Sequence, residues 1–185
     1  MAIMFAHIIK SLFTEAETGE IIRLSSRSDR SEASLVGGAM HHNIRRASVA
    51  WLDDAGTAKW VMDRIVDAVA EANRASFGFM LDGFDEKLQV ATYGADEQGH
   101  FDWHSDRGGG PLAARRKLTI VAQLSKPGTY EGGELQLNPA GQPFAASREI
   151  GDAIVFASFL LHRVTPVTKG ERHSLTCWVH GPDFT

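Results

Sequence analysis

The spacing of hydrophobic residues changes at about residue 80, from a helical period to short strand-like segments. Thr14 and Glu17 have the spacing of a helix capping box, and a helical pattern then continues to about Ser25. Residues 44–52 are rich in β-branched and apolar types and are expected to form a strand. A second helix is predicted after Thr57, its expected N-cap, because apolar residues recur there every three or four positions, at Val61, Ile65, Ala68, Val69 and Ala72. That apolar face should pack against a sheet.

After Gly83 the chain alternates between short apolar segments and turn-forming residues. The segments with the length and composition of strands are 88–93, 100–106, 117–124, 134–137, 153–157, 162–167 and 174–179. Glycine and proline recur between them, for example at 108–110, 127–128 and 139–141. Such short, regularly spaced strands predict an antiparallel sandwich or barrel. We therefore expect one mainly β (α+β) domain over residues 1–185. Its jelly-roll core would span 84–182, and residues 1–83 would supply supporting helices on one outer face and a strand.

Composition and charge exclude several classes of function. The chain has 185 residues, 43% of them hydrophobic, which suits a folded domain. Its formal net charge of −4 argues against nucleic-acid binding, and its basic cluster, 115–117, is expected to be a solvated strand end. No apolar segment approaches the roughly 18 residues of a membrane span, and the apolar start of the chain lacks the basic region of a signal peptide. With Cys177 as the single cysteine, no intrachain disulfide can form, so a cytoplasmic location is expected. The sequence does not indicate an oligomeric state.

A candidate metal site begins with His104 and Asp106, which lie two residues apart in a strand-like segment. Side chains alternate between the faces of a strand, so a residue and the second one after it point the same way. The two side chains can therefore bind one ion together. His162, at the start of another strand-like segment, is the leading candidate for the third ligand.

Two histidines and one carboxylate form the ligand set of non-haem Fe(II) oxygenases, because this set leaves one face of the octahedron open. A structural zinc site would need four ligands, usually including thiolates, and Cys177 is the only cysteine. Short His-x-Asp pairs also occur by chance, and the alternative is a surface strand with a local hydrogen bond. The adjacent His41 and His42 would face opposite sides of a strand and are not expected to chelate an ion together.

The segment LHRVTPVTKGERHSLTCW, residues 161–178, closely resembles the Fe(II)/2-oxoglutarate-dependent oxygenases. The similarity is to the prolyl-4-hydroxylase-like branch, which includes the bacterial PKHD-type hydroxylases. In that family a V-x-P-V-x-x-G-x-R run follows the distal metal-binding histidine, and Arg172 stands ten positions after His162. The resemblance extends upstream through Tyr93, the His-x-Asp pair and the YEGGEL turn at 130–135. It covers about half of the chain, from Leu88 to Trp178.

The resemblance implies a double-stranded β-helix in which Arg172 binds the far carboxylate of 2-oxoglutarate. The planar fork of arginine suits a carboxylate, because it donates two parallel hydrogen bonds. Tyr93 occupies the position of a further donor in the family, and its alternative role is that of a packed core aromatic. Ser174 lies two residues after Arg172, should face the same way, and can donate its hydroxyl to the same carboxylate.

The family implies a dioxygenase that hydroxylates an unactivated C–H and releases succinate and CO₂. Its cofactors and cosubstrates would be Fe(II), 2-oxoglutarate and O₂, with ascorbate as an optional addition. The expected target is a prolyl or related amino-acid residue in a protein or peptide. One alternative is hydroxylation of a free amino acid or other small metabolite, and another is a non-catalytic metal-binding jelly-roll module. The sequence does not decide whether Arg45 or Arg46 contacts the substrate.

Overall fold

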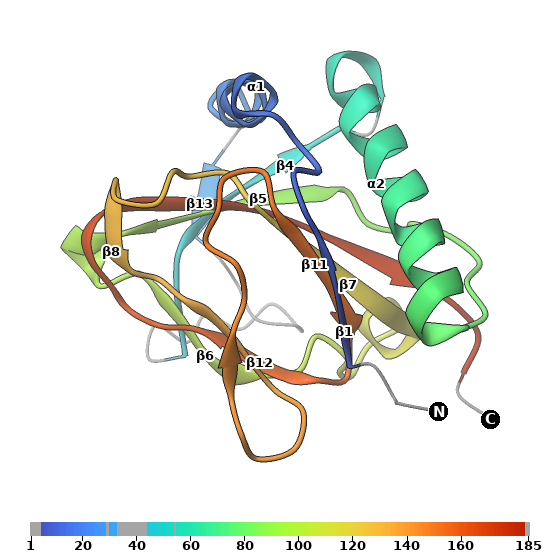
Figure 1. Cartoon of the computed structure of the whole chain (residues 1–185). Helices are drawn as coiled ribbons and strands as arrows, with labels where there is room; N and C mark the ends of the chain where they lie inside the picture. The colour runs from blue at the N-terminus through green and yellow to red at the C-terminus, as the bar shows by residue number, and fades with distance from the viewer. Residues whose placement is uncertain (1–4, 29, 33–43, 54, 184–185) are drawn as a thin grey trace.

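The computed structural model describes residues 5–28, 30–32, 44–53 and 55–183. Two antiparallel sheets face each other, and the helices α1 and α2 lie on the outer side of the larger sheet (Figure 1). The larger sheet contains, in spatial order, β1 (Ala6–Ile9), β11 (Ala153–Ala157), β7 (Arg116–Gln123), β13 (Val167–His180), β5 (Leu88–Gly94), β4 (Ser48–Leu52) and β2 (Arg30–Glu32), with β8 (Tyr130–Gly132) paired to β13. The smaller sheet contains β10 (Phe144–Ala145), β9 (Leu135–Asn138), β12 (Leu161–Val164), β6 (His100–His104) and β3 (Arg45–Arg46). This architecture confirms the mainly β, jelly-roll prediction.

The first helix, α1 (Glu15–Ser25), begins as the sequence predicts. The Glu17 backbone N–H donates to the Thr14 hydroxyl at 3.3 Å, and the Thr14 backbone N–H donates to the Glu17 carboxylate at 2.8 Å. These two bonds form a capping box, which satisfies N–H groups that have no partner within the helix. The capping-box prediction is therefore confirmed.

The second helix, α2 (Lys59–Ala72), buries the predicted apolar face, but the predicted N-cap is wrong. Thr57 lies inside a 3-10 turn, Gly56–Ala58, and the helix follows Ala58 without a side-chain cap. A residue whose backbone is already helical cannot take the extended conformation of an N-cap. A π-helical turn, Asn73–Phe77, continues α2 and ends at Gly78, whose φ is +66°.

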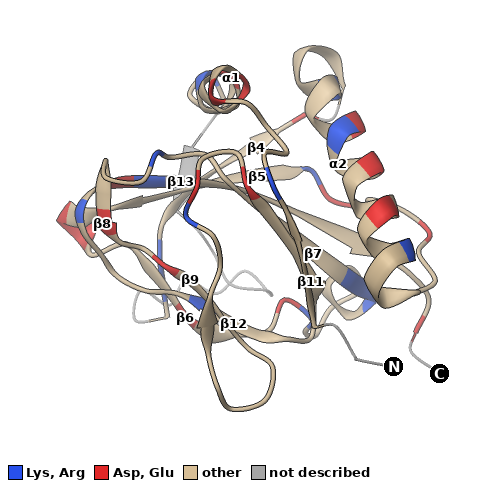
Figure 2. Ribbon diagram, in the orientation of Figure 1, with Lys and Arg blue, Asp and Glu red and all other residues tan. Residues whose placement is uncertain are grey.

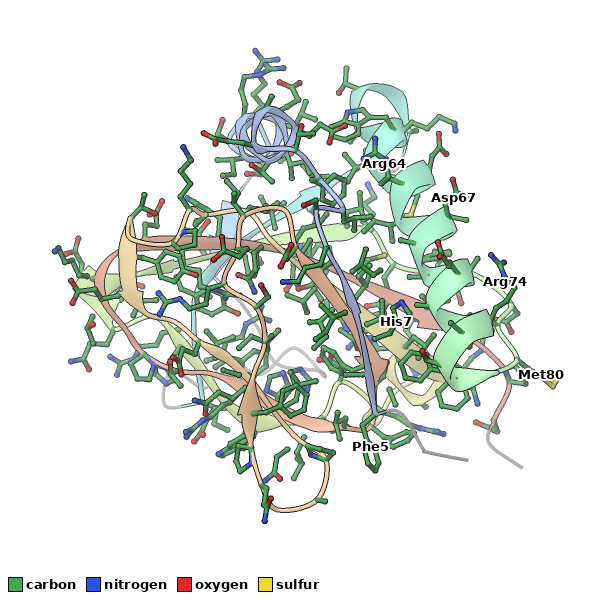
Figure 3. All side chains as sticks on the ribbon, in the orientation of Figure 1. Phe5, His7, Arg64, Asp67, Arg74 and Met80 are labelled. Carbon is green, nitrogen blue, oxygen red and sulfur yellow. The ribbon has the colours of Figure 1, made fainter. Side chains whose placement is uncertain are left out.

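Charged residues lie along the outer side of α2 (Figure 2). None of the described helices is long and apolar enough to cross a membrane. Figure 3 shows Arg64 and Asp67 on α2 and His7 on strand β1, and all three residues line one hollow beside the helix. The His7 Nδ1 atom lies 2.7 Å from the Ser76 hydroxyl, so this bond ties the edge strand to the end of the helical segment.

Two apolar layers hold the fold together. One lies between the helices and the larger sheet and includes Ile21 and Ile65, and the other lies between the two sheets and includes Leu137 and Phe156. The predicted strand 44–52 divides at Ala47, because β3 pairs with β6 in the smaller sheet and β4 pairs with β5 in the larger one. The chain thereby passes from one sheet to the other at Ala47.

Candidate active site

The strand register places His104 and His162 opposite each other. They are direct partners in the β6–β12 pair, and their ring centroids are 4.1 Å apart. Asp106 lies 3.6 Å from His104 (Oδ1 to Nε2) and 3.4 Å from His162 (Oδ2 to Nε2). One ligand atom from each residue lies within 4.8 Å of the others, and no other such trio occurs among the described residues. His41 and His42 lie outside the described residues.

Asp106 reaches this position differently from the way the sequence predicts. β6 ends at His104, and Asp106 lies in the bend that follows rather than on the strand. The bend is held by Ser158, whose carbonyl oxygen accepts hydrogen bonds from the Arg107 backbone N–H at 3.0 Å and the Ser105 hydroxyl at 3.1 Å. The two side chains therefore converge because the bend is fixed, and strand alternation is not the cause.

Hydrogen bonds set the tautomers of both histidines. His104 Nδ1 lies 2.7 Å from the Asp102 carbonyl oxygen, and His162 Nδ1 lies 2.9 Å from the Leu160 carbonyl oxygen. A carbonyl oxygen can only accept, so each Nδ1 carries the hydrogen and each Nε2 keeps its lone pair for a metal ion. Burial lowers the pKa of His162 to about 4, which keeps this ring neutral at neutral pH.

Asp106 is ionised despite its burial. Desolvation raises the pKa of this carboxyl, but His162, His104 and the Thr119 hydroxyl together lower it well below its usual range. Two imidazole nitrogens and one carboxylate have the donor chemistry that suits a divalent iron ion, and they leave part of the coordination sphere open.

Arg172 lines the same cavity as this trio, a space of about 330 Å³ between the two sheets. The Arg172 side chain is 1% exposed, and its Nε and Nη2 atoms donate to the Gln123 side-chain oxygen at 3.3 and 3.0 Å. Its Nη1 atom is buried and has no hydrogen-bond partner among the described residues. Burial lowers the pKa of this guanidinium. A buried cation with an unused donor is costly, and a carboxylate ligand would relieve that cost.

The structure places Tyr93 and Ser174 beside Arg172. Tyr93 is the direct partner of Arg172 in the β5–β13 pair, and its ring centroid lies 5.5 Å from the guanidinium carbon. Ser174 follows two residues later on β13, and all three residues line the cavity. The geometry predicted for these residues is present, and their contact with a cosubstrate stays a prediction.

Tyr130 and Gln123 are neighbours of Arg172 to which the sequence assigns no role. The Tyr130 hydroxyl is buried and, like Arg172 Nη1, has no hydrogen-bond partner among the described residues. Gly133 lets the two side chains come together, because a Cβ there would lie 3.0 Å from Arg172 Cδ and 3.5 Å from Tyr130 Cδ2. The Gly-Gly pair at 132–133 is the sequence signal that could have drawn attention to this close approach.

The prediction of a solvated basic strand end at 115–117 is wrong for Arg116 and Lys117, which are both buried. Arg116 binds the Glu86 carboxylate, with 2.7 Å between Nε and Oε2, and donates from Nη1 to the Asp106 carbonyl oxygen at 3.1 Å. His180 Nε2 lies 3.0 Å from the same Glu86 carboxylate. Burial raises the pKa of Glu86, but the bonds from His180 and Arg116 outweigh it and lower the pKa to about 2. The part-buried Arg116–Glu86 ion pair lies at the wall of the cavity, and Arg116 supports the bend that carries Asp106.

Arg45 and Arg46 take different positions. Arg45 lines the cavity, donates to the Gln89 side-chain oxygen at 2.7 Å and lies 4.6 Å from the centroid of the Phe101 ring. Arg46 instead donates to the Glu97 carbonyl oxygen at 3.3 Å. Of the two, Arg45 is therefore the one that lines the cavity, and contact of either with a substrate stays a prediction.

Known sequences similar to this chain belong to iron- and 2-oxoglutarate-dependent oxygenases, which agrees with the residues of the cavity. A family model described as the 2OG-Fe(II) oxygenase superfamily matches residues 88–180. A PKHD-type hydroxylase from Colwellia psychrerythraea is 42% identical over 65 residues, which are 35% of this chain and 29% of that relative. A PKHD-type hydroxylase from Pseudomonas putida is 25% identical over 185 residues, covering 95% of this chain and 77% of the relative. The more identical segment thus spans less than a third of its relative's length.

Comparison with solved structures supports the fold. A prolyl hydroxylase from Trichoplax adhaerens, in complex with a peptide fragment of hypoxia inducible factor, gives a TM-score of 0.80 at 19% identity, covering 96% of this chain and 84% of that one. A Pseudomonas putida prolyl-4-hydroxylase gives a TM-score of 0.74 at 21% identity, covering 96% of this chain and 93% of that one. Because the family model matches residues 88–180, which include the trio and Arg172, the chain belongs to the 2OG-Fe(II) oxygenase superfamily.

Proposed function

We propose that this chain is an Fe(II)- and 2-oxoglutarate-dependent dioxygenase that hydroxylates an unactivated C–H and releases succinate and CO₂. The observation that carries the proposal is that His104, Asp106 and His162 line one cavity together with Arg172. A site that only bound a metal would not need a buried arginine with an unused donor beside it.

In this proposal the ion is held by the Nε2 atoms of His104 and His162 and by the Asp106 carboxylate. Bound Fe(II) would supply the one-electron chemistry that activates O₂. The residues of the chain hold the two imidazoles in the tautomer that offers Nε2 and keep the carboxylate ionised.

The cosubstrate is proposed to direct its far carboxylate at Arg172. The Arg172 Nη1 atom and the Tyr130 hydroxyl are buried donors that need an acceptor. Tyr93 and Ser174, which line the cavity with Arg172, supply hydroxyl groups there. A ferrous ion, the Asp106 carboxylate and 2-oxoglutarate together carry a net charge of about −1, which the Arg172 cation would balance.

We propose a prolyl or related residue of a peptide or protein as the target. Support comes from the relatives described as PKHD-type hydroxylases and from the structural neighbour that holds a peptide fragment. The cavity wall around Arg45, Trp51 and Trp178 would receive this substrate. An assay of succinate release with proline-containing peptides and with free amino acids, each with and without ascorbate, would separate this target from a small metabolite.

An anaerobic titration of the Fe(II)-loaded protein with 2-oxoglutarate tests the proposed function. The wild type should develop the visible metal-to-ligand charge-transfer band. Arg172→Ala should need at least about tenfold more 2-oxoglutarate to develop it, because the loss of a hydrogen bond to a charged group costs about 1.5–3 kcal/mol of binding free energy. Arg64→Ala removes an arginine of α2 that does not line this cavity and should titrate like the wild type. If iron binds and no band develops, the 2-oxoglutarate proposal is wrong and a non-catalytic metal-binding module is the better description.

A further inference from the structure

The Asp106 carboxylate is held by a buried hydroxyl that comes from the opposite sheet. The Thr119 hydroxyl, on β7, donates to Asp106 Oδ2 at 2.8 Å. Thr119 is 0% exposed and Asp106 is 6% exposed, so water does not compete for this bond. The bond therefore fixes the rotation of a carboxylate that the loop backbone alone would leave adjustable.

The direction of this bond follows from the chemistry of the groups. An ionised carboxylate can only accept, so the single hydroxyl hydrogen of Thr119 must point at Asp106. The Ser158 hydroxyl lies 3.0 Å from the Thr119 hydroxyl and must therefore be the donor in that second bond. A directed chain results, in which Ser158 donates to Thr119 and Thr119 donates to Asp106.

Ser158 is the first residue of this series of hydrogen bonds and is itself firmly held. Its side chain is fully buried, and its backbone N–H donates to the Lys117 carbonyl oxygen at 2.9 Å on β7. Its carbonyl oxygen also holds the bend around Asp106 through the bonds from Ser105 and Arg107. The same residue thus fixes both the backbone and, through Thr119, the side chain of the third proposed ligand.

We propose that Thr119, supported by Ser158, is a positioning residue that presents the Asp106 carboxylate to the metal ion. The inference rests on the proposed function. Because Oδ2 already accepts the Thr119 hydrogen bond, Oδ1 is the oxygen with greater capacity to bind the ion. Oδ1 lies 3.6 Å from His104 Nε2, beyond the usual length of a hydrogen bond. Binding through one oxygen keeps the remaining coordination positions for the cosubstrate and for O₂.

The test is the affinity for Co(II), measured by anaerobic titration of the metal-free protein in the absence of cosubstrate. Co(II) absorption bands report both binding and coordination number, so the readout does not depend on activity. Thr119→Val removes the hydroxyl at nearly constant volume, and the dissociation constant should rise about 10- to 100-fold, as is typical for groups that orient a metal ligand. Thr119→Ser keeps the hydroxyl and should restore most of the affinity.

A matched control is Thr92→Val. Thr92 is also buried in the larger sheet, but its hydroxyl lies 3.0 Å from His173 Nδ1 and does not line the cavity. This variant should have wild-type affinity for Co(II). Ser158→Ala should weaken binding less than Thr119→Val does, and the double variant should bind like Thr119→Val alone, because Ser158 acts through Thr119.

The outcomes separate the two proposals. A dissociation constant for Thr119→Val within twofold of the wild-type value would overturn the positioning role. An equal loss of Co(II) affinity in the Thr92→Val control would overturn it as well. Should Thr119→Val not fold, wild-type affinity in Ser158→Ala would overturn it instead. A wild-type protein that does not bind Co(II) would refute the metal site of the proposed function, and with it this inference.

Discussion

The guanidinium carbon of Arg116 lies 4.0 Å from the centroid of the Trp178 ring, at the wall of the cavity that holds the proposed metal ligands. The two residues come from neighbouring strands, β7 and β13, whose pairing is irregular between Val179 and His180. An arginine over the face of an indole packs well, and its nitrogen atoms can still donate hydrogen bonds in the plane of the guanidinium group. Here they bind Glu86 and the carbonyl oxygen of Asp106, so one side chain connects the cavity wall with the bend that carries Asp106.

Replacing Arg116 with methionine should strongly destabilise the protein. The change would leave the Glu86 carboxylate, 11% exposed, without its main cation, and breaking one half of a buried ion pair costs about 3–5 kcal/mol. Urea unfolding measures this loss. The double variant Arg116→Met with Glu86→Gln should recover a large part of it, because no unpaired charge then remains. Equal stability of the single and double variants would contradict this account.

The Glu86 carboxylate should make stability depend on pH in acid. Its pKa falls from 4.5 to about 2 on folding, so below pH 4.5 the unfolded chain binds a proton that the folded protein does not. The contribution of Glu86 is therefore fully present above about pH 4.5 and is lost as the pH falls toward 2; it amounts to about 3 kcal/mol. Urea unfolding of the wild type and of Glu86→Gln between pH 6 and pH 2 measures it. The stability difference between the two proteins should shrink as the pH falls, and a constant difference would refute the assignment.

The sequence predicts the parts of the site whose signal is local. His104 and Asp106 stand two residues apart, and the resemblance to a known family motif adds Arg172 ten positions after His162, so these residues can be proposed together from the sequence. The helices and most strands are predictable for the same reason, because an amphipathic helix or a short apolar segment shows its period within a few residues.

The supporting residues could not be predicted in this way. Every residue of β7 is buried, on one side against the helices and on the other toward the smaller sheet, so the strand shows no alternation that would single out Thr119 or Gln123. Arg116 looks like a solvated strand end, because its partner Glu86 lies 30 residues earlier and meets it only through the tertiary fold. Tyr130 approaches Arg172 because β8 pairs with β13, and strand pairing over that distance leaves no mark on the sequence.

Gly133→Ala should weaken the binding of 2-oxoglutarate in addition to lowering the stability of the fold. Gly133 has a φ of +62°, and a Cβ there would lie 2.9 Å from Val167 Cγ2 and 3.0 Å from Arg172 Cδ. The arginine must then shift, and we expect at least about tenfold weaker cosubstrate binding, which corresponds to about 1.4 kcal/mol. Gly141→Ala is the matched control, because Gly141 has a φ of +81° but no atom within 4 Å of the added Cβ. It should cost about 1–2 kcal/mol of stability and leave the affinity unchanged. Equal affinities in the two variants, measured by the charge-transfer titration, would refute the packing argument.

Tyr130→Phe should weaken cosubstrate binding without destabilising the free protein. The Tyr130 hydroxyl is buried and has no hydrogen-bond partner among the described residues, so removing it takes away a desolvated group that contributes no bond in the unliganded state. When a carboxylate binds beside Arg172, the same hydroxyl becomes a donor to a charged acceptor, a bond worth about 1.5–3 kcal/mol. We therefore expect a free energy of unfolding equal to or slightly above the wild-type value, and a dissociation constant for 2-oxoglutarate raised at least about tenfold. Thr92→Val removes a buried hydroxyl that lies 3.0 Å from His173 Nδ1 and not beside Arg172, so it should leave the affinity unchanged. A less stable variant with unchanged affinity would show instead that the Tyr130 hydroxyl serves the fold, and the carboxylate would then depend on Arg172 and its other neighbours.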